Sequence, residues 1–175
     1  MNIRRAVVGD AAGLATLLSD YLREKYPSHR GSSADELERD VLGHGRGQRV
    51  VVAELGQGLG GFVAWDAVYD MHWAMHGAQI ADLYVIPSAR GRGIALALVA
   101  GLCAEAHKDG ATFLRGASYD RASPTGRFYE RIAVGADSAE CHCSGRAFRT
   151  LAGLHGQRIR TIVQSLPPKE WNLEP

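Results

Sequence analysis

Apolar and polar positions alternate with two periodicities along the chain, and each periodicity predicts one kind of secondary-structure element. Strand-like runs cover residues 2–6, 49–55, 61–69, 80–86, 112–119 and 146–151, and the run at 80–86 is rich in β-branched and aromatic residues. Apolar residues at helical spacing cover residues 14–22, 33–42, 94–106, 123–134 and 154–166. The predicted order is therefore β-α-α-β-β-β-α-β-α-β, followed by one further helix.

Turn and cap residues mark the ends of these elements. Asp10 stands before the first helix as its N-cap, and Ser33 with Glu36 has the spacing of a capping box for the second. The glycine-rich residues 56–60 join two strands as a hairpin. Gly110 suits the left-handed C-cap of the helix that begins at residue 94.

A glycine-containing turn between the strand at 80–86 and the helix at 94–106 is the most informative feature. It reads Arg90-Gly91-Arg92-Gly93-Ile94-Ala95. Glycines at the entry to a helix let an anion approach the first N–H groups closely, with the positive end of the helix dipole behind them. The turn therefore predicts a phosphate-binding site, the alternative being an ordinary tight turn from strand to helix.

Three phosphate-binding designs place glycines at such a turn, and two of them fail on spacing. The dinucleotide fingerprint needs a third glycine where Leu96 stands, and the P-loop needs a Gly-Lys-Ser/Thr run that the chain lacks. The third design is arginine, two spacers, glycine, one spacer, then glycine or alanine, and Arg90, Gly93 and Ala95 satisfy it. In this run the chain closely resembles the acetyl-CoA-binding motif of the GNAT superfamily of N-acetyltransferases.

The resemblance implies an α/β (α+β) fold, with a mixed central β-sheet of six to seven strands, flanked by helices and splayed at the cofactor strand. The predicted order of elements matches that arrangement over about residues 2–151. We expect residues 1–152 to form the acetyltransferase domain. Residues 153–175 are then expected to be a helical extension of the same domain.

The resemblance also implies acetyl-CoA as the acyl donor. Its pyrophosphate would lie on backbone N–H groups of the glycine-containing turn, and its pantetheine arm would pair with the preceding strand like an added strand. In the family that strand carries a bulge, and an N–H of Val85 or its neighbour would polarise the thioester carbonyl. The residues assigned to the cofactor in this way are Leu83, Tyr84, Val85, Arg90, Gly91, Arg92, Gly93, Ile94 and Ala95.

Tyr129 is the candidate for protonating the leaving thiolate. It lies in a Phe-Tyr-Glu-Arg run at residues 128–131, which resembles the Phe-Tyr-Glu-Lys run of the family's last helix. A phenol is protonated at neutral pH and can donate. The alternative is a core tyrosine on an amphipathic helix. Ala122 replaces an asparagine that the family usually has seven residues earlier, and Ser123 or Asp120 is a candidate substitute.

The general base is predicted less directly. Asp82 is the only carboxylate on the cofactor strand, although many relatives carry glutamate one residue earlier, where this chain has Ala81. Because side chains alternate along a strand, Asp82 and residue 81 point to opposite faces in a regular strand. Glu54 and Asp66 are the other candidates, and each of the three is also explained as an ordinary solvated or paired carboxylate.

Acceptor specificity is expected in residues 21–33 and 69–77, and Asp66 and Asp70 are candidates for attracting an ammonium group. A loose likeness to polyamine-type acetyltransferases over residues 115–149 favours a small amine over a protein N-terminus. A loop that only covers the sheet, or that packs on a second subunit, explains residues 69–77 equally well. We expect a homodimer, which is common in the family.

Composition excludes several other classes. Lys and Arg number 20 against 19 Asp and Glu, which argues against a nucleic-acid partner, in which Arg90 and Arg92 would meet a phosphate backbone. No apolar run is long enough to span a membrane, and the first nine residues lack a signal-peptide core, so we expect a cytoplasmic protein with no membrane partner. Its three cysteines suit a reducing compartment.

No metal site is expected. His72 and His76 have helical spacing but no third ligand nearby, and Cys141-His142-Cys143 is interpreted as structural. Cys103 lies on the apolar face of a helix, so it is expected to be buried rather than to act as a nucleophile. The remaining alternative to an enzyme is a regulatory module that binds acyl-CoA without turnover.

Overall fold

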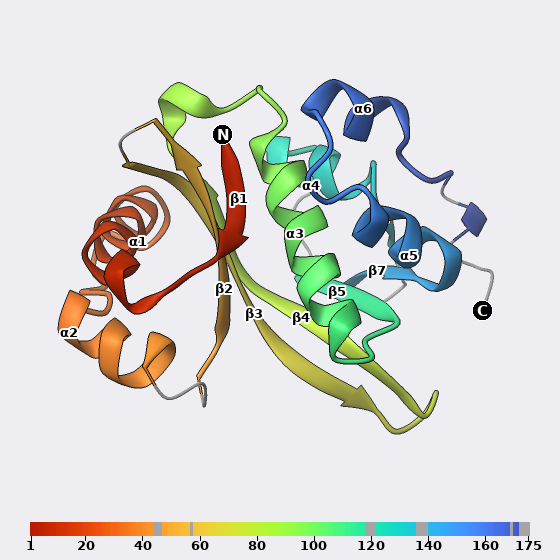
Figure 1. The fold of residues 1–175 in the computed structure, drawn as a ribbon, viewed down its shortest axis with the longest axis horizontal. Coiled ribbons are helices and arrows are strands. Elements are labelled where there is room, and N and C mark those ends of the chain that lie inside the picture. The colour runs from red at the N-terminus through yellow and green to blue at the C-terminus, as the bar shows by residue number, and fades with distance from the viewer. Residues whose placement is uncertain (44–46, 57, 118–121, 136–139, 169, 172–175) are drawn as a thin grey trace.

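The computed structural model describes residues 1–43, 47–56, 58–117, 122–135, 140–168 and 170–171. In these residues a seven-stranded mixed sheet has the order β1-β2-β3-β4-β5-β7-β6, and helices cover both of its faces (Figure 1). This arrangement confirms the predicted fold class. The strands are β1 (Asn2–Arg5), β2 (Arg49–Leu55), β3 (Gly58–Asp70), β4 (Met75–Val85), β5 (Phe113–Ala117), β6 (Val134–Gly135) and β7 (Glu140–Ser144). The helices are α1 (Ala11–Lys25), α2 (Ala34–Leu37), α3 (Ile94–Lys108), α4 (Pro124–Tyr129), α5 (Gly145–Gly153) and α6 (Ile159–Gln164), with short helical turns η1 (Val8–Asp10), η2 (Glu38–Leu42) and η3 (Pro87–Ala89).

The two faces of the sheet carry separate apolar cores. On one face α1 and α2 cover a core that includes Leu14, Val52 and Phe62. On the other face α3 and α5 pack over a core that includes Trp65 and Leu98. Because β2 and β3 are buried on both faces, their sequences are almost continuously apolar rather than alternating.

A β-bulge interrupts the pairing of β3 with β4. Ala64 lies opposite Asp82, whereas Trp65 lies opposite Ile80, so Ala81 is the extra residue on β4. The bulge resets the alternation of side chains. Directly opposed residues share a face, so Asp82 lies with Ala64 on the α1 side of the sheet.

β4 and β5 separate after a short parallel ladder. Their pairing runs only from Gly77 opposite Phe113 to Gln79 opposite Arg115, while β4 continues to Val85. The predicted splay at the cofactor strand is therefore confirmed, and we call the space between Ile80–Val85 and β5 the β4–β5 gap.

Backbone groups of β4 point into this gap. The N–H of Ile86 donates to the carbonyl of Gly60 on β3, at 3.0 Å. Backbone groups alternate in direction along a strand, so the N–H and C=O groups of Val85 and Leu83 point away from β3. In the described part of the chain, no strand lies opposite them there.

The prediction of a strand at residues 146–151 is wrong, because this segment belongs to helix α5. Ala147, Phe148, Leu151 and Ala152 are its buried apolar residues, and they have helical rather than strand spacing. The last strand of the chain is instead β7, which pairs with β5.

Other boundaries also differ from the prediction. The helix expected at 123–134 ends at Tyr129, and of the helix expected at 154–166 only α6 forms, after a turn in which Gly156 has φ +81°. β4 begins at Met75 because the hairpin turn is tight. The carboxylate of Asp70 accepts the N–H groups of His72 and Trp73 and so closes that turn.

None of the described helices has the length and apolar character that a membrane crossing requires.

Asp10 joins the first strand to the first helix. Its carboxylate accepts two hydrogen bonds from Arg4, at 2.6 and 2.8 Å, and one from the N–H of Val7, at 2.8 Å. The bonds from Arg4, and then the bond from Val7, outweigh the effect of burial and hold the pKa of Asp10 below its ordinary range. The side chain is only 10% exposed, so this pair contributes more than a typical surface ion pair.

We expect Asp10→Asn to lower the free energy of unfolding by about 2 kcal/mol at neutral pH, measured by urea denaturation. Because folding lowers the pKa of Asp10, its stabilising contribution is fully present at pH values above the ordinary carboxyl pKa. The contribution is lost as the pH falls through the pKa of Asp10 in the folded protein. The control is Asp40→Asn, which removes an exposed ion pair with Arg39 and should change stability little. Equal stabilities of the wild type and Asp10→Asn at neutral pH would contradict the assignment.

Candidate functional site

The turn that leads from β4 into α3, residues 90–96, is the predicted phosphate-binding site, and we call it the phosphate loop. Gly91 and Gly93 have φ values of +74° and +79°, which favour glycine. In the described part of the chain, the N–H groups of residues 91–96 donate to no acceptor. The first turn of α3 carries no acidic residue. Free N–H groups at the positive end of a 15-residue helix are suited to a phosphate.

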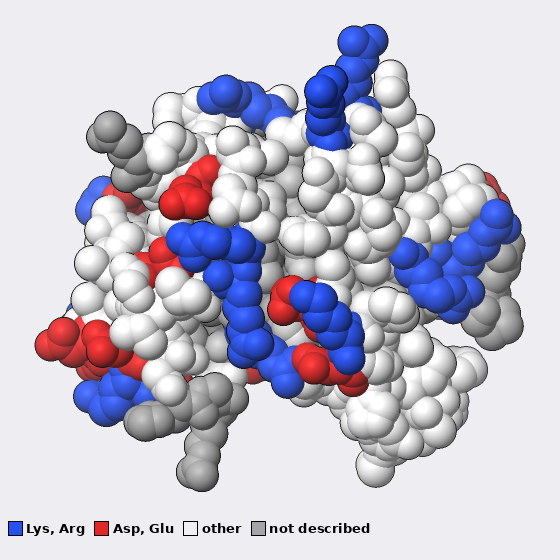
Figure 2. Space-filling model, viewed as in Figure 1, with Lys and Arg blue, Asp and Glu red and all other residues white. Residues whose placement is uncertain are grey.

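α6 packs directly against this loop, which the sequence did not predict. A Cβ built on Gly93 would lie 2.2 Å from the Ile159 side chain, whereas one built on Gly91 would meet nothing within 4 Å. The open side of the loop is therefore at Gly91. Figure 2 shows basic side chains along the edge of the molecule where the loop and α6 lie, and Arg92 and Arg158 are exposed.

Arg90 anchors the start of the loop through its side chain. Its Nε donates to the Val85 carbonyl at 2.8 Å, and its Nη2 donates to both carboxylate oxygens of Glu24, at 2.8 and 2.9 Å. The guanidinium also lies over the Tyr84 ring, 5.4 Å from its centroid. Its backbone N–H donates to Pro87. Arg90 therefore orders the loop, and the N–H groups that follow it are the ones available to a ligand.

Glu24 was not predicted, because it lies in the last turn of α1, far from the loop in sequence. It also accepts a hydrogen bond from the Tyr84 hydroxyl at 3.0 Å. The bonds from Arg90 lower the pKa of the Glu24 carboxyl below its ordinary range. Burial, and then the bond to Glu24, raise the pKa of Tyr84 to about 12. Glu24 is therefore an ionised carboxylate held between the Arg90 guanidinium and the neutral phenol of Tyr84.

The two predicted catalytic residues lie on different elements: Asp82 is on β4, and Tyr129 is the last residue of helix α4. Asp82 is half-buried on β4, on the α1 face. Tyr129 is 3% exposed, and its ring lies against β5, because a Cβ built on Gly116 would be 3.0 Å from its Cε1 atom. Tyr129 belongs to the core under α3, so the two side chains lie on opposite faces of the sheet.

The other predicted carboxylates are engaged elsewhere. Glu54 accepts a hydrogen bond from Asn2 and pairs with Arg4 at the β1–β2 edge, two strands away from β4. Asp66 accepts a hydrogen bond from Gln48 at 3.1 Å, and Asp70 is ion-paired with Arg115. Of these candidates for the base, only Asp82 lies on a strand that borders the gap.

Several other candidates have structural roles. The Ser123 hydroxyl accepts the N–H of Gly126 at 2.9 Å and so caps α4. Burial raises the pKa of Cys143 to about 12 and that of Cys103 well above its ordinary value, so both are inert thiols. Asp120 and the side chains of Cys141 and His142 lie outside the described residues.

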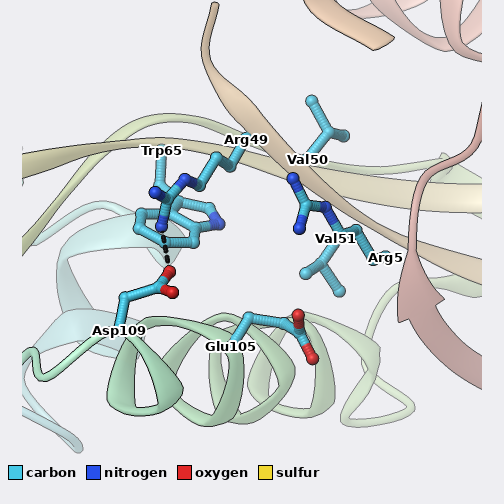
Figure 3. A pocket seen from close by; sticks show the side chains of 7 residues that line it. All are labelled: Arg5, Arg49, Val50, Val51, Trp65, Glu105 and Asp109. Atoms are coloured by element: carbon cyan, nitrogen blue, oxygen red, sulfur yellow. Dashed lines mark hydrogen bonds and ion pairs between the residues drawn. The ribbon is translucent and has the colours of Figure 1, made fainter. Parts of the chain in front are cut away.

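A small charged pocket lies at the other end of α3 (Figure 3). Its lining includes Arg49, Trp65 and Glu105, and an ion pair between Arg49 and Asp109 crosses one side of it. The Arg49 guanidinium stacks on Trp65, 4.9 Å from the ring centroid. Because the phosphate loop is at the opposite, N-terminal end of α3, this pocket is separate from the candidate site.

Comparison with known proteins identifies the class of protein that has this fold and loop. Residues 14–133 match the model of the Acetyltransferase (GNAT) family, and the chain belongs to this family. The predicted family resemblance is therefore confirmed. A search of curated protein sequences found no significant match.

Solved structures show the same fold. A ribosomal-protein-alanine N-acetyltransferase from Brucella melitensis biovar Abortus 2308 is 26% identical with a TM-score of 0.64, over 79% of this chain and 95% of that one. An integron cassette protein from the mobile metagenome of V. cholerae is 22% identical with a TM-score of 0.65, over 77% and 85% of the two chains. An aminoglycoside acetyltransferase from an uncultured soil metagenomic sample, HMB0005, is 20% identical with a TM-score of 0.62, over 78% and 93%.

Proposed function

We propose that this protein is an acetyl-CoA-dependent N-acetyltransferase that acetylates a primary amine of a small molecule by direct transfer in a ternary complex. One observation carries the proposal. The β4–β5 gap, with backbone groups of Leu83 and Val85 directed into it, ends at the phosphate loop with its unpaired N–H groups. A strand-like arm that ends in a pyrophosphate fits both parts, and acetyl-CoA supplies an activated acetyl thioester on such an arm.

In this proposal, the phosphate loop and strand β4 bind different parts of acetyl-CoA. N–H groups from Gly91 to Ala95 receive the pyrophosphate at the start of α3. Leu83 and Val85 pair with the pantetheine arm through their backbone, and the N–H of Val85 or its neighbour polarises the thioester carbonyl. The side chain of Tyr84 lies on the α1 face, where its hydroxyl donates to Glu24. Tyr84 therefore helps to hold Glu24 in place and makes no side-chain contact with a ligand in the gap.

Asp82 and Tyr129 carry the proton transfers in this proposal. Asp82 removes a proton from the acceptor ammonium, directly or through a water, on the α1 face of the gap. The amine nitrogen then forms a bond to the carbonyl carbon as the carbon–sulfur bond breaks. Tyr129 donates its proton to the leaving thiolate from the opposite face. Their placement on opposite faces supports the division into base and acid.

The acceptor proposed is a small cationic amine. Asp82 and Asp66 lie on the same face of the sheet, where two carboxylates favour an ammonium group. The aminoglycoside acetyltransferase among the solved structures supports this class. A second candidate is a protein N-terminus, supported by the likeness to a ribosomal-protein-alanine N-acetyltransferase.

We further propose a cytoplasmic homodimer in which residues 1–152 form the acetyltransferase domain and residues 153–175 are its extension. Tyr69, Met71 and Trp73, at the end of the β3–β4 hairpin, are 54%, 87% and 66% exposed. An exposed apolar cluster of this kind supports a contact with a second copy. The packing of Ile159 on the phosphate loop supports assigning the extension to the same domain.

Gly91 offers a clean test of cofactor binding. Gly91→Asp places a carboxylate in the open side of the loop without a clash, and Asp tolerates a positive φ. Measured by calorimetry, we expect wild type to bind acetyl-CoA with micromolar affinity and Gly91→Asp to bind about tenfold more weakly or worse, because the new charge repels phosphate. Gly91→Asn is the isosteric neutral control and should stay close to wild type. Absence of acetyl-CoA binding by wild type would refute the proposal.

Catalysis is tested by replacing the two proton carriers. We expect Asp82→Asn and Tyr129→Phe to lower kcat by about a hundredfold or more while leaving the Kd for acetyl-CoA unchanged, because each removes one proton transfer. Thiol release with a panel of amines is the assay, and Asp66→Asn is the control for general loss of charge on the acceptor face. Acetyl-CoA binding by wild type without turnover of any amine in the panel would favour a regulatory acyl-CoA-binding module.

A further inference from the structure

Glu24 connects helix α1 to the phosphate loop across the end of β4. Both of its carboxylate oxygens accept hydrogen bonds from Arg90, one of them also accepts the Tyr84 hydroxyl, and Arg90 in turn donates to Val85. We propose that Glu24 is a positioning residue for cofactor binding, holding Arg90 so that the phosphate loop and the end of β4 are set before the cofactor arrives. The inference rests on the proposed function.

The contacts fix Arg90 at both its ends. Its backbone N–H is held by Pro87, and its guanidinium is held by Glu24 on one side and by Val85 on the other. Nη2 alone donates to both carboxylate oxygens of Glu24, while Nε donates to the Val85 carbonyl, so two nitrogens of the guanidinium are held by two different partners. Gly91 follows immediately with a positive φ, so fixing Arg90 fixes the point from which the free N–H groups of the loop begin.

Arg90 also sets where the gap ends. The Val85 carbonyl points away from β3 toward the gap, where an added strand would donate to it. Arg90 Nε donates to that carbonyl instead, at 2.8 Å. Strand-like pairing of a ligand is thereby limited to the N–H of Val85 and to residues before it. Beyond Val85, the ligand meets the N–H groups of the phosphate loop instead.

Considered by charge alone, Glu24 is expected to weaken cofactor binding, which is the opposite of the positioning effect. A carboxylate beside a phosphate-binding loop repels an anionic ligand and competes with it for Arg90. Hydrogen bonds from Arg90 keep the pKa of Glu24 low, so the carboxylate is ionised at neutral pH. If only charge mattered, neutralising Glu24 would tighten cofactor binding. If Glu24 acts by positioning, neutralising it weakens binding.

The same contacts extend to the acceptor side. The Tyr84 ring lies 5.8 Å from the ring of Tyr21 on α1, and Tyr21 lies 6.3 Å from Tyr26, centroid to centroid. Residues 21–33 are the segment in which acceptor specificity is predicted. Because coupling between two sites is reciprocal, cofactor binding that tightens Arg90 on Glu24 also orders the end of α1.

The test compares Glu24→Gln with Asp20→Asn in the full-length protein. Both variants remove one carboxylate from α1, but Asp20 pairs with Arg23 and not with the loop. Calorimetry with acetyl-CoA should show at least about fivefold weaker binding for Glu24→Gln and no weakening for Asp20→Asn. Thermal unfolding of the ligand-free proteins checks that both variants are folded. In addition, acetyl-CoA should slow amide hydrogen exchange at residues 21–26 in wild type but not in Glu24→Gln.

The outcomes distinguish the positioning role of Glu24 from the proposed function itself. Weaker binding by Glu24→Gln, together with the lost exchange effect, supports the positioning role. Equal or tighter binding by a folded Glu24→Gln overturns it and leaves the proposed function intact. Failure of wild type itself to bind acetyl-CoA overturns the proposed function and this inference with it. The comparison of wild type with the variant therefore separates the two failures.

Discussion

The candidate site depends on backbone groups of β4 that have no strand partner among the residues the structure describes. β4 is paired with β3 along its whole length but with β5 over only three register pairs, from Gly77 to Gln79. Backbone N–H and C=O groups are costly to leave without partners. Leu83 and Val85 present such groups to the β4–β5 gap, and Arg90 satisfies the Val85 carbonyl. In the proposed function, an extended ligand that carries its own amide groups pairs with these backbone groups.

The bulge at Ala81 makes this arrangement compatible with chemistry on both faces. It shifts the alternation of β4 so that Asp82 lies on the α1 face, beside Asp66, while the backbone beyond it still faces the gap. Tyr129 lies on the other face, with its ring against β5. In the proposed function, the base Asp82 and the acid Tyr129 therefore lie on opposite faces of the sheet.

Sequence predicted what is local and missed what depends on distant contacts. The glycine turn that leads from β4 into α3, the capping box of Ser33 with Glu36 and the end of α3 were predicted correctly, because each depends on neighbouring residues. The segment at 146–151 was misassigned because a short run with few apolar residues fits either period until its packing on α3 is known. Glu24 and Ile159 carry no local signal at all. Each acts on the phosphate loop from a helix distant in sequence, so only the folded chain shows their role.

Amide hydrogen exchange at Leu83 and Val85, with and without acetyl-CoA, tests the central claim most directly. If the gap receives the pantetheine arm as an added strand, the ligand supplies acceptors to these two N–H groups, and their exchange should slow strongly. The N–H of Tyr84, which points toward β3, is the internal reference and should change little. Saturating acetyl-CoA that leaves the exchange of Leu83 and Val85 unchanged would contradict the claim that this gap is the cofactor site.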